Sequence, residues 1–496
     1  MAALGLTGRH SQEPPPGPIE TQPRLGTSPD PGRAPGADPL LDALFPEAPS
    51  TVDWGLDRMR TALAELGDPH RRYRCLHVGG TNGKGSVAST WASILQRHDA
   101  RTGLYTSPHL CSFRERIMVG GRPVPATRLV ESASRLRALA SELRMSFFEA
   151  TTLLAMVVFA EEGVDTACIE VGLGGRLDAT NVVVPEVSAI TNVALDHQEY
   201  LGHSLEEIAR EKAGIIKPGV PIVTAEGRPA VLEVLRARAE EVGAPLHRVE
   251  PWRDITDLRL GPAGTRFTLR AGTGRAIELE TPLPGAHQAT NAALAVRALE
   301  LLPDPPSREA IAAGVARVQW PGRGQIRRID ERLFIFDVAH NVAGVEALVR
   351  VLADLAPPRP IVLLTGILGD KDWSRMLPPL VDLADRAVFT VPSSAPAERL
   401  WNPRKVADTV ARGTPIEVRA RVDTALDRAV ALARGGTVVV TGSCHTVGDV
   451  LVVLGLNPFE PDDDSDGPST APAAPRGVLT KPGPPGQRGK GWAGGW

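Results

Sequence analysis

The sequence predicts an α/β protein of two domains. Short β-branched runs alternate with longer helical patterns between about residues 51 and 302, which is typical of a parallel sheet covered by helices. After the proline-rich segment 302–306 and the turn at 320–322, the same alternation starts again. We therefore expect an N-terminal parallel-sheet domain and a smaller C-terminal Rossmann-like α/β domain, with the boundary near residue 320.

In the first domain, apolar runs predict strands at 74–78, 167–171, 187–190 and 222–224. Helices are predicted at 51–66, 86–96, 127–143, 147–161 and 205–213, the first because Leu56, Met59, Leu63 and Leu66 recur at helical spacing. From about 245 to 279, short strands and glycine turns predict an antiparallel appendage, and a helix at 287–302 closes the domain. In the second domain we expect strands at 333–337, 361–365, 386–391 and 437–441, with helices at 342–355 and 424–433.

Both ends of the chain differ in composition from the part between them. Residues 1–40 are rich in Pro, Gly, Ser and Thr, and residues 459–496 combine an acidic cluster with a Gly/Pro/Lys-rich end. Neither segment has enough apolar surface to offset its ordering entropy, so both are expected to be disordered. This leaves a central domain at 41–320 and a C-terminal domain at 321–458.

The bulk composition excludes several classes of protein. A net charge of −3 gives no electrostatic reason to expect a nucleic acid or an anionic membrane as a partner. The four cysteines form no C-x-x-C pair, which favours reduced thiols. No apolar run reaches the length of a membrane span, and the first ten residues lack a secretory core. We expect a cytoplasmic protein that works as a monomer.

The most informative segment is 76–86, LHVGGTNGKGS, where a strand-like run enters a glycine-rich turn before a helix. Glycines allow backbone N–H groups to surround phosphate oxygens, and a lysine can reach the terminal phosphates. The segment thus predicts a P-loop for a nucleoside triphosphate in an ATPase-like domain, although one glycine separates lysine from hydroxyl, unlike the usual G-x-x-x-x-G-K-[ST] pattern. The alternative is an ordinary strand–helix turn. The residues concerned are Thr81, Asn82, Gly83, Lys84, Gly85 and Ser86.

This loop and seven later motifs follow one order along the chain. They are SPHL at 107–110 with FRERI at 113–117, EVGLGGRLDATN at 170–181, ITN at 190–192 with DH at 196–197, EKAG at 211–214, HQ at 287–288 with Asn291, WPGR at 320–323, and DVAHN at 337–341. In sequence and order they resemble the folylpolyglutamate synthase and dihydrofolate synthase family, within the wider Mur-ligase group. Two positions depart from the family pattern, Val338 in place of glycine and Gly79 in place of alanine.

The resemblance implies an ATP-dependent ligase that adds L-glutamate to dihydropteroate, to tetrahydrofolate, or to both. Amide formation needs an activated carboxylate, and ATP can supply a phosphoryl group to form an acyl phosphate. One alternative is a Mur-type ligase that acts on a UDP-linked muropeptide. Another, from a different class, is a regulatory NTPase.

For the metal, the resemblance implies Mg²⁺, with two ions expected, bound by Ser107, Glu170 and His197. Glu170 ends an apolar strand, and a carboxylate buried there needs a cation. Taken alone, Ser107 is equally suited to cap a turn, and His197 to cap the next helix.

Lys84, Lys212 and His197 are the expected catalytic residues. The resemblance implies that CO₂ carbamylates Lys212, which requires a neutral amine and therefore a lowered pKa. The sequence alone favours a lysine that complements the dipole at a helix C-terminus.

The resemblance also assigns the remaining ligand contacts. Asn291, Arg323, Asp337 and His340 correspond to positions that contact ATP, although a turn arginine and a strand-end helix cap are alternatives for Arg323 and Asp337. The pterin-pocket segments contribute Arg58, Glu149, Thr151, Arg176 and Asp178.

Overall fold

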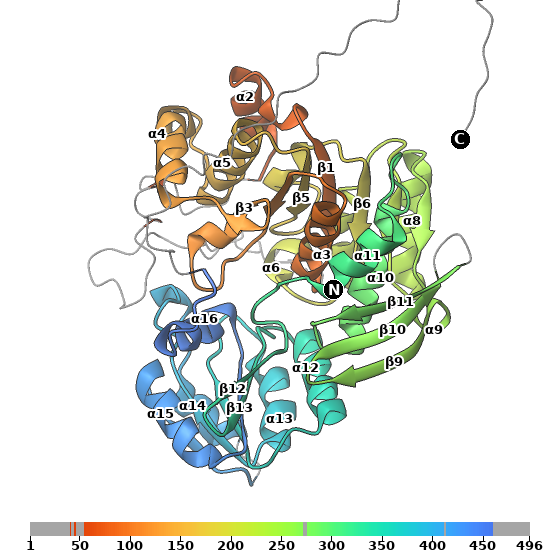
Figure 1. Cartoon of the computed structure of the whole chain (residues 1–496). Helices are drawn as coiled ribbons and strands as arrows, with labels where there is room; N and C mark the ends of the chain where they lie inside the picture. Colours follow the sequence, from red (N-terminus) through yellow and green to blue (C-terminus); the bar gives the residue numbers. More distant parts are fainter. Residues whose placement is uncertain (1–39, 41–43, 46–53, 271–274, 411–412, 460–496) are drawn as a thin grey trace, which may run out of the picture. The chain divides into compact units, whose positions relative to one another are not determined.

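A computed structural model describes residues 40, 44, 45, 54–270, 275–410 and 413–459. Disorder was predicted for 1–40 and 459–496; residues 1–39 and 460–496 lie outside the described residues, whereas Leu40 is buried in the core of the first domain. The described part contains three sheets, with eight, three and six strands, and belongs to one compact unit (Figure 1). The predicted fold class, a parallel-sheet N-terminal domain followed by a separate C-terminal α/β domain, is confirmed.

The first sheet is parallel over most of its width, in the order β4-β3-β2-β5-β1-β6-β7-β8. Only the β2–β3 and β3–β4 pairs at one edge are antiparallel. The bounds are β1 (Arg74–Gly79), β2 (Thr102–Tyr105), β3 (Ile117–Val119), β4 (Arg122–Pro123), β5 (Thr166–Glu170), β6 (Val187–Ile190), β7 (Ile222–Thr224) and β8 (Leu246–Arg248).

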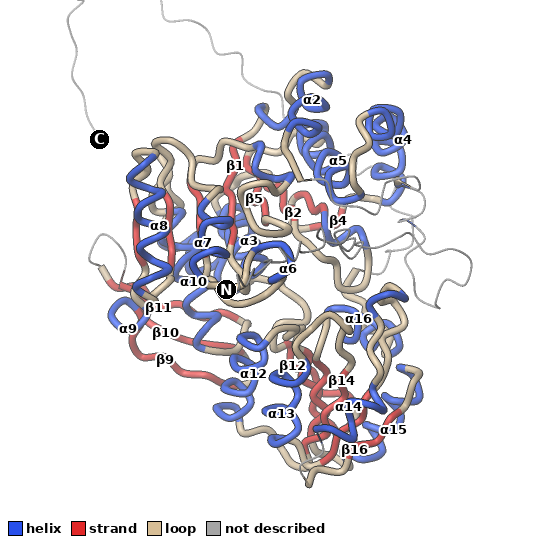
Figure 2. Tube along the Cα trace, turned by 180° about the vertical axis from the view of Figure 1, so that it is seen from behind, coloured by secondary structure: helices blue, strands red, loops and turns tan. Residues whose placement is uncertain are grey.

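Both faces of this sheet are buried, because alternate residues of its central strands enter different cores. Cys75 of β1 packs with α2, α4 and α5, whereas Leu76 packs with α3, α10 and α11. Residues of α7 and α8 pack with β6, β7 and β8, and Figure 2 shows the two helices next to each other. The helices are α2 (Asp57–Glu65), α3 (Lys84–Arg97), α4 (Ala126–Glu142), α5 (Phe147–Glu161), α6 (Gln198–Leu201), α7 (Leu205–Ala213), α8 (Pro229–Glu241), α9 (Pro251–Asp254), α10 (Ala286–Leu299) and α11 (Arg308–Ala316), with 3₁₀ turns η1 (Pro69–Arg71), η2 (Phe113–Arg116) and η3 (Ala179–Val182).

The antiparallel appendage is shorter than predicted. Residues 246–248 form β8, which pairs in parallel with β7 and so continues the first sheet. The reason is α8, a crossover helix that the sequence analysis did not predict and that returns the chain to the sheet edge. The appendage itself begins at β9 (Ile255–Gly261) and continues through β10 (Gly264–Arg270) and β11 (Ala276–Thr281). Its buried face, including Phe267 and Leu279, packs with α10.

The C-terminal sheet has the order β12-β13-β17-β14-β15-β16, antiparallel only at β12. Helices cover both faces, as a Rossmann-like arrangement requires: α12, α13 and α14 lie on one core and α15 and α16 on the other. The strands are β12 (Gln325–Ile329), β13 (Arg332–Phe336), β14 (Ile361–Thr365), β15 (Arg386–Phe389), β16 (Ile416–Val418) and β17 (Thr437–Thr441); the helices are α12 (Val342–Leu355), α13 (Trp373–Leu383), α14 (Pro403–Val410), α15 (Val422–Ala433) and α16 (Cys444–Val453), with the turn η4 (Ala397–Arg399).

The helix boundaries that the sequence predicted correctly are those marked by local capping residues. The predicted helices 147–161 and 205–213 match α5 and α7, which begin after Ser146 and Ser204, each in a capping box. The helix predicted at 51–66 is observed only as α2, and 51–53 lie outside the described residues. No prediction covered α13, which contains two internal prolines and so lacks the usual helix pattern.

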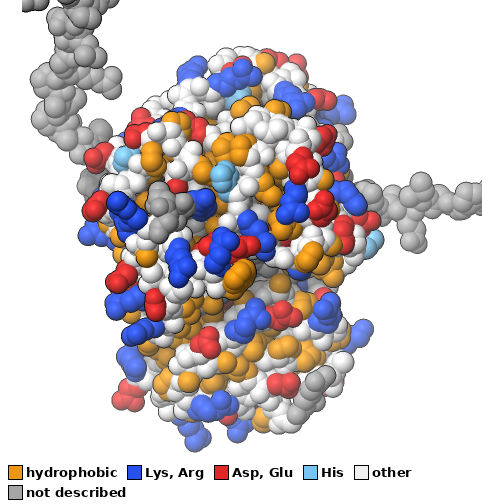
Figure 3. All heavy atoms as spheres, turned by 90° about the vertical axis from the view of Figure 1, so that its right-hand side faces the viewer, with side chains coloured by type: hydrophobic (Ala, Val, Ile, Leu, Met, Phe, Trp, Pro, Cys, Tyr) orange, Lys and Arg blue, Asp and Glu red, His pale blue; other side chains and the backbone are white. Residues whose placement is uncertain are grey.

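The surface and cysteines carry little specialised chemistry. On the face drawn in Figure 3, basic and acidic side chains of the described residues are interspersed. The four cysteines are free thiols. Within the described ranges, no helix is both long enough and apolar enough to cross a membrane.

Trp91 of α3 provides a test of the first-domain core. Its side chain is fully buried and its Nε1–H donates to the Ala295 carbonyl of α10 at 3.0 Å. Replacement of Trp91 by alanine leaves a cavity and removes this hydrogen bond, and should lower the free energy of unfolding by about 3–5 kcal/mol. Denaturant unfolding followed by circular dichroism measures this change.

The matched control is Trp252→Ala, because the Trp252 side chain is 76% exposed. That substitution should change stability by no more than about 0.5 kcal/mol. Equal effects of the two substitutions would contradict the assignment of Trp91 to the core between α3 and α10.

Candidate active site

The glycine-rich loop joins β1 to α3 at the carboxyl edge of the first sheet. Gly80 and Gly83 have φ angles of +137° and +86°, which side chains other than glycine rarely adopt. A Cβ atom at Gly80 would lie 1.8 Å from Thr191 Oγ1, and one at Gly83 would lie 2.6 Å from Asn291 Oδ1. The loop is thus closed on two sides by neighbouring residues.

Hydrogen bonds hold the same loop in place. The Thr81 N–H donates to the Asn192 carbonyl at 2.8 Å, and the Asn82 N–H donates to Asn192 Oδ1 at 3.1 Å. Lys84 is the first residue of α3, and its ammonium donates to the Thr81 carbonyl at 3.1 Å. The loop is therefore shaped in advance, with a lysine and a helix N-terminus at its centre.

The additional glycine of the motif, Gly85, has a packing explanation. A Cβ atom at this position would lie 2.4 Å from Cζ2 of Trp320. Trp320 belongs to the segment that connects the two large sheets, and its ring lies 5.6 Å from the Arg323 guanidinium carbon. Gly85 thus allows this connecting segment to pack directly against the phosphate loop.

A cavity of about 390 Å³ lies in front of the loop. It is lined from the carboxyl ends of strands in both large sheets, where α/β folds commonly bind ligands. All the predicted catalytic, metal-binding and nucleotide-binding residues line it: Thr81, Asn82, Gly83, Lys84, Gly85, Ser86, Ser107, Glu170, His197, Lys212, Asn291, Arg323, Asp337 and His340.

Among the carboxylates that line this cavity near the glycine-rich loop, Glu170 is the most buried. Its Oε2 accepts a hydrogen bond from the Ser107 N–H at 3.1 Å. Burial raises the pKa of Glu170, and the positive charge of Lys84 opposes this increase. This buried carboxylate and the Ser86 and Ser107 hydroxyls line the same cavity, and they are the hard oxygen donors that Mg²⁺ prefers. Across the described residues, no group of three or more His, Cys, Asp and Glu side chains forms a metal site of its own.

Lys212 is not placed to complement the C-terminal dipole of its own helix, α7. It is buried in the last turn of α7, and its ammonium donates to the Gly80 carbonyl at 2.9 Å. Burial, together with the charge of Lys84, lowers the pKa of Lys212 to about 7. A large share of the amine is therefore neutral near neutral pH.

His197 and Asp337 do not cap the helices that follow them. His197 stands at the N-cap position of α6, with φ +51°, but its side chain makes no capping hydrogen bond. Burial and the charge of Lys371 lower the pKa of His197 to about 4, so the imidazole is neutral. The N-cap of α12 is Asn341. Asp337 instead accepts from the Gly324 and Ala339 N–H groups, and burial raises the pKa of Asp337 to about 6.

The predicted pterin-pocket residues do not line this cavity. Their polar side chains contact neighbouring protein groups. Arg58 pairs with Glu149 at 3.0 Å. The Thr151 hydroxyl donates to the Phe147 carbonyl, and Arg176 pairs with Glu211. Asp178 accepts from Leu173 N–H, and Leu173 lines the cavity.

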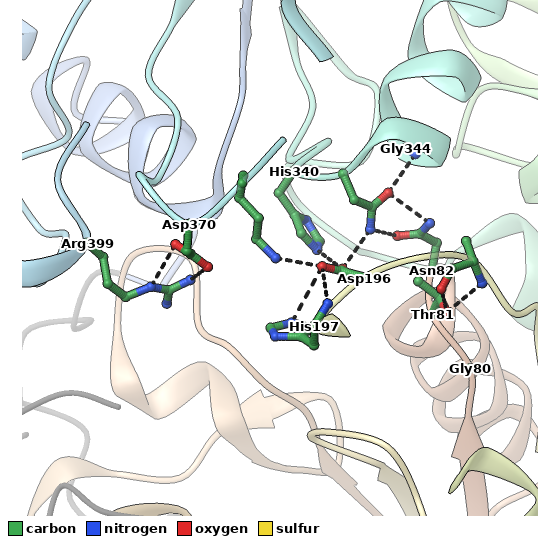
Figure 4. Close-up of polar contacts among 12 residues, drawn as sticks. Gly80, Thr81, Asn82, Asp196, His197, His340, Gly344, Asp370 and Arg399 are labelled. Carbon is green, nitrogen blue, oxygen red and sulfur yellow. Dashed lines mark hydrogen bonds and ion pairs between the residues drawn. The ribbon is translucent and has the colours of Figure 1, made fainter. Parts of the chain in front are cut away.

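The sequence analysis missed Asp196, on which several polar contacts of the site converge (Figure 4). Its Oδ1 accepts from Lys371 at 2.7 Å, and its Oδ2 accepts from Asn341 at 2.9 Å. Burial would raise the pKa of Asp196, but the nearby His340 and His197 imidazoles and the charge of Lys371 hold this pKa well below its usual value. Asp196 and Asn341 stood inside quoted motifs, whereas nothing in the sequence marked Lys371.

A second cavity, of about 820 Å³, adjoins the first. Both are lined by Asp196, His197, Arg228 and two alanines. Its other polar lining includes Arg375 and Arg399. The two cavities therefore meet at the Asp196–His197 segment.

Comparisons with known proteins cover most of the chain. Residues 78–299 match the family model "Mur ligase middle domain", and residues 322–444 match "Mur ligase, glutamate ligase domain". The dihydrofolate synthase/folylpolyglutamate synthase of Bacillus subtilis is 34% identical over 412 residues, which cover 80% of this chain and 94% of that protein.

Solved structures agree with the sequence matches. The Mycobacterium tuberculosis folylpolyglutamate synthase complexed with ADP and AMPPCP has a TM-score of 0.75 at 33% identity, over 81% of this chain and 95% of that chain. A bifunctional folylpolyglutamate synthase/dihydrofolate synthase with Mn, AMPPNP and L-glutamate bound has a TM-score of 0.72 at 32% identity, over 82% and 95% of the two chains.

Gly85→Ala tests the packing of the connecting segment on the loop. The new methyl group cannot fit beside Trp320, so the ring or the loop must move. A displacement of the groups in this loop by about 1 Å should lower turnover about 100-fold. Steady-state phosphate release measures the effect.

Gly227→Ala is the control, because the nearest atom to a Cβ there is the end of the Arg248 side chain at 3.7 Å. This variant should retain turnover close to that of the parent protein. A Gly85→Ala variant with the same activity would show that the contact with Trp320 does not constrain the loop.

Proposed function

Because the chain belongs to the folylpolyglutamate synthase/dihydrofolate synthase family of Mur ligases, we propose that it adds L-glutamate both to dihydropteroate and to reduced folates at the one cleft in front of the phosphate loop. The protein is an ATP-dependent ligase that joins glutamate to folates. The observation that carries the proposal is the convergence of the loop, Glu170 and Lys212 on this cleft. We assign 41–320 to nucleotide binding and 321–458 to completing the glutamate-ligase site.

The first step is the activation of the substrate carboxylate, since oxide is too poor a leaving group for direct attack by an amine. Transfer of the γ-phosphoryl group of ATP gives an acyl phosphate and ADP. The glutamate amine then attacks the acyl carbon, the amide forms, and inorganic phosphate leaves with one oxygen of the original carboxylate. Because phosphoryl transfer depends mainly on positioning and on charge neutralisation, Lys84 and Arg323 are placed in this scheme against the phosphates.

Divalent ions would be held by Ser86, Ser107, Glu170 and His197. The neutral imidazole of His197 and the oxygen donors beside Glu170 support this assignment. When bound, such ions neutralise charge on the transferred phosphate. Asn291, Asp337 and His340 are proposed to contact the nucleotide, since they line the same cavity.

We propose that carbamylation turns Lys212 into an anion that faces the metal-binding residues. A pKa of about 7, set mainly by burial, supports this because only the neutral amine reacts with CO₂. The hydrogen bond from Lys212 to the Gly80 carbonyl keeps the amine next to the phosphate loop.

Glutamate is proposed to enter through the second cavity. That cavity meets the first at Asp196 and His197, and Arg228 and Arg375 in its lining supply cations for carboxylates. Arg58, Glu149, Thr151, Arg176 and Asp178 remain the proposed pterin-binding set. The contact of Asp178 with the cavity-lining loop at Leu173 is consistent with that role. Action as a monomer in the cytoplasm is part of the same proposal.

The reaction can be tested with the purified protein. Phosphate release should require ATP, Mg²⁺, L-glutamate and a pteridine substrate together. With dihydropteroate or tetrahydrofolate offered in parallel, mass spectrometry should find each product heavier by a glutamate residue. ¹⁸O from a labelled substrate carboxylate should appear in the phosphate, because the acyl phosphate transfers that oxygen.

Three results would contradict the proposal. Phosphate release indifferent to glutamate and pteridine would favour a regulatory NTPase. Release stimulated by a UDP-linked muropeptide and not by folates would favour a Mur-type ligase. Product from only one of the two pteridines would remove the dual activity.

Carbamylation of Lys212 predicts a pH-dependent ¹³C signal. In ¹³C-bicarbonate, the protein should give a carbamate resonance that increases as the pH rises through about 7, because protonated lysine does not react and the pKa of Lys212 is about 7. Lys212→Arg should abolish the resonance and lower turnover.

Lys217→Arg is the matched control, since burial lowers the pKa of Lys217 to about 8 while its ammonium donates to the Asn181 carbonyl outside the cleft lining. That variant should keep the resonance. A resonance that survives Lys212→Arg would disprove the assignment.

A further inference from the structure

Several polar contacts between the two domains converge on one carboxylate. Asp196 follows β6 of the first sheet, and all three of its partners from the second domain belong to the loops after β13 and β14. Lys371 donates to Oδ1 at 2.7 Å, Asn341 donates to Oδ2 at 2.9 Å, and the His340 Nε2 lies 3.6 Å from Oδ2. Figure 4 shows His340 pointing toward Asp196.

Asn341 extends this contact to the phosphate loop. Its amide forms a reciprocal pair with the amide of Asn82, at 2.9 Å and 3.2 Å. Its Oδ1 also accepts from the Gly344 N–H at 2.8 Å, which caps α12. One buried side chain therefore binds the loop, Asp196 and its own helix at the same time.

Lys371 occupies a turn that is itself held in place. Asp370, its neighbour, pairs with Arg399 at 2.8 Å. The Gly369 N–H donates to the Arg399 carbonyl at 2.7 Å, and the Lys371 N–H donates to the Leu368 carbonyl. The backbone of Lys371 is thus fixed to η4 of its own domain, and its ammonium reaches across to the first domain.

The Lys371–Asp196 pair is shielded from water, because the side chains are only 8% and 9% exposed. When a buried carboxylate loses its cation, its charge is left uncompensated, and the folded arrangement around it is strongly destabilised. The lost pair would therefore change how the two domains meet at Asp196, and the amide pair would transmit that change to Asn82.

We propose that Lys371 is a positioning residue of the ligase: through Asp196 and Asn341 it holds the C-terminal domain in register with the phosphate loop. The inference rests on the proposed function only for its kinetic readout. This positioning role differs from a role in binding substrate. Lys371 acts on Asp196 and contacts no ligand.

The test compares Lys371→Met, Lys371→Arg and the double variant Lys371→Met/Asp196→Asn. Loss of the cation alone should lower kcat about 100-fold, as expected when reacting groups are displaced by about 1 Å, with the KM for glutamate changed less than about threefold. Removal of both charges should recover at least about tenfold of kcat, since no unpaired buried charge remains. Lys371→Arg should keep most of the activity, because it retains the ion pair.

A second readout is independent of the folate reaction. Hydrogen–deuterium exchange of the peptide over 80–86 should be at least about tenfold faster in Lys371→Met than in the parent protein. The reason is that the loop loses its hydrogen-bonded contact with the second domain. Lys405→Met, an exposed lysine of the same domain, should leave both exchange and kcat unchanged.

Each remaining outcome overturns the proposal. An unchanged kcat in Lys371→Met would show that the pair is dispensable. A raised KM for glutamate with unchanged loop exchange, and no recovery in the double variant, would show that Lys371 binds substrate directly. Should the parent protein fail to use folates, the exchange experiment still decides whether Lys371 positions the loop.

Discussion

The arrangement of the site depends on one steric constraint, which is that the phosphate loop has no room for side chains at three of its glycines. A Cβ atom would clash with Thr191 at Gly80, with Asn291 at Gly83 and with Trp320 at Gly85. These partners come from the end of β6, from α10 and from the segment between the domains. The first sheet, the helix beside the appendage and the domain connection therefore all determine the shape of one short loop, and Lys84 is placed where they meet.

Burial controls the chemistry of the groups around that loop. It raises the pKa values of Glu170 and Asp337 and lowers those of Lys212 and His197. Burial therefore favours a neutral imidazole and a partly neutral amine at neutral pH, in a cavity suited to an anionic triphosphate and to metal ions. Asp196 is different, because the neighbouring side chains of His340, His197 and Lys371 stabilise its charged form, and it remains ionised.

The site is complete only where residues of both domains meet. The loop, Glu170 and Lys212 come from the first sheet and its helices, whereas Arg323, Asp337 and His340 come from the second domain. Polar contacts between side chains join the two sets at Asp196 and Asn82. The proposed contacts to ATP and the contacts that couple the domains thus involve the same few residues, in one cleft shared by both domains.

The sequence by itself determined the features that are local in the chain. The glycine-rich loop, the capped helices α5 and α7, the strands β6, β7, β14 and β17, and the two-domain order all follow from spacing, capping and apolar runs within about 20 residues. The ordered motifs likewise indicated the residues that line the cleft.

Only the tertiary structure decided which distant side chains pair. Lys371 and Asp196 are 175 positions apart, Arg58 and Glu149 are 91 apart, and β8 joined the first sheet instead of the appendage. Periodicity records which face of an element is buried. The identity of the partner across a domain boundary depends on how the sheets pack, and no local pattern contains that information.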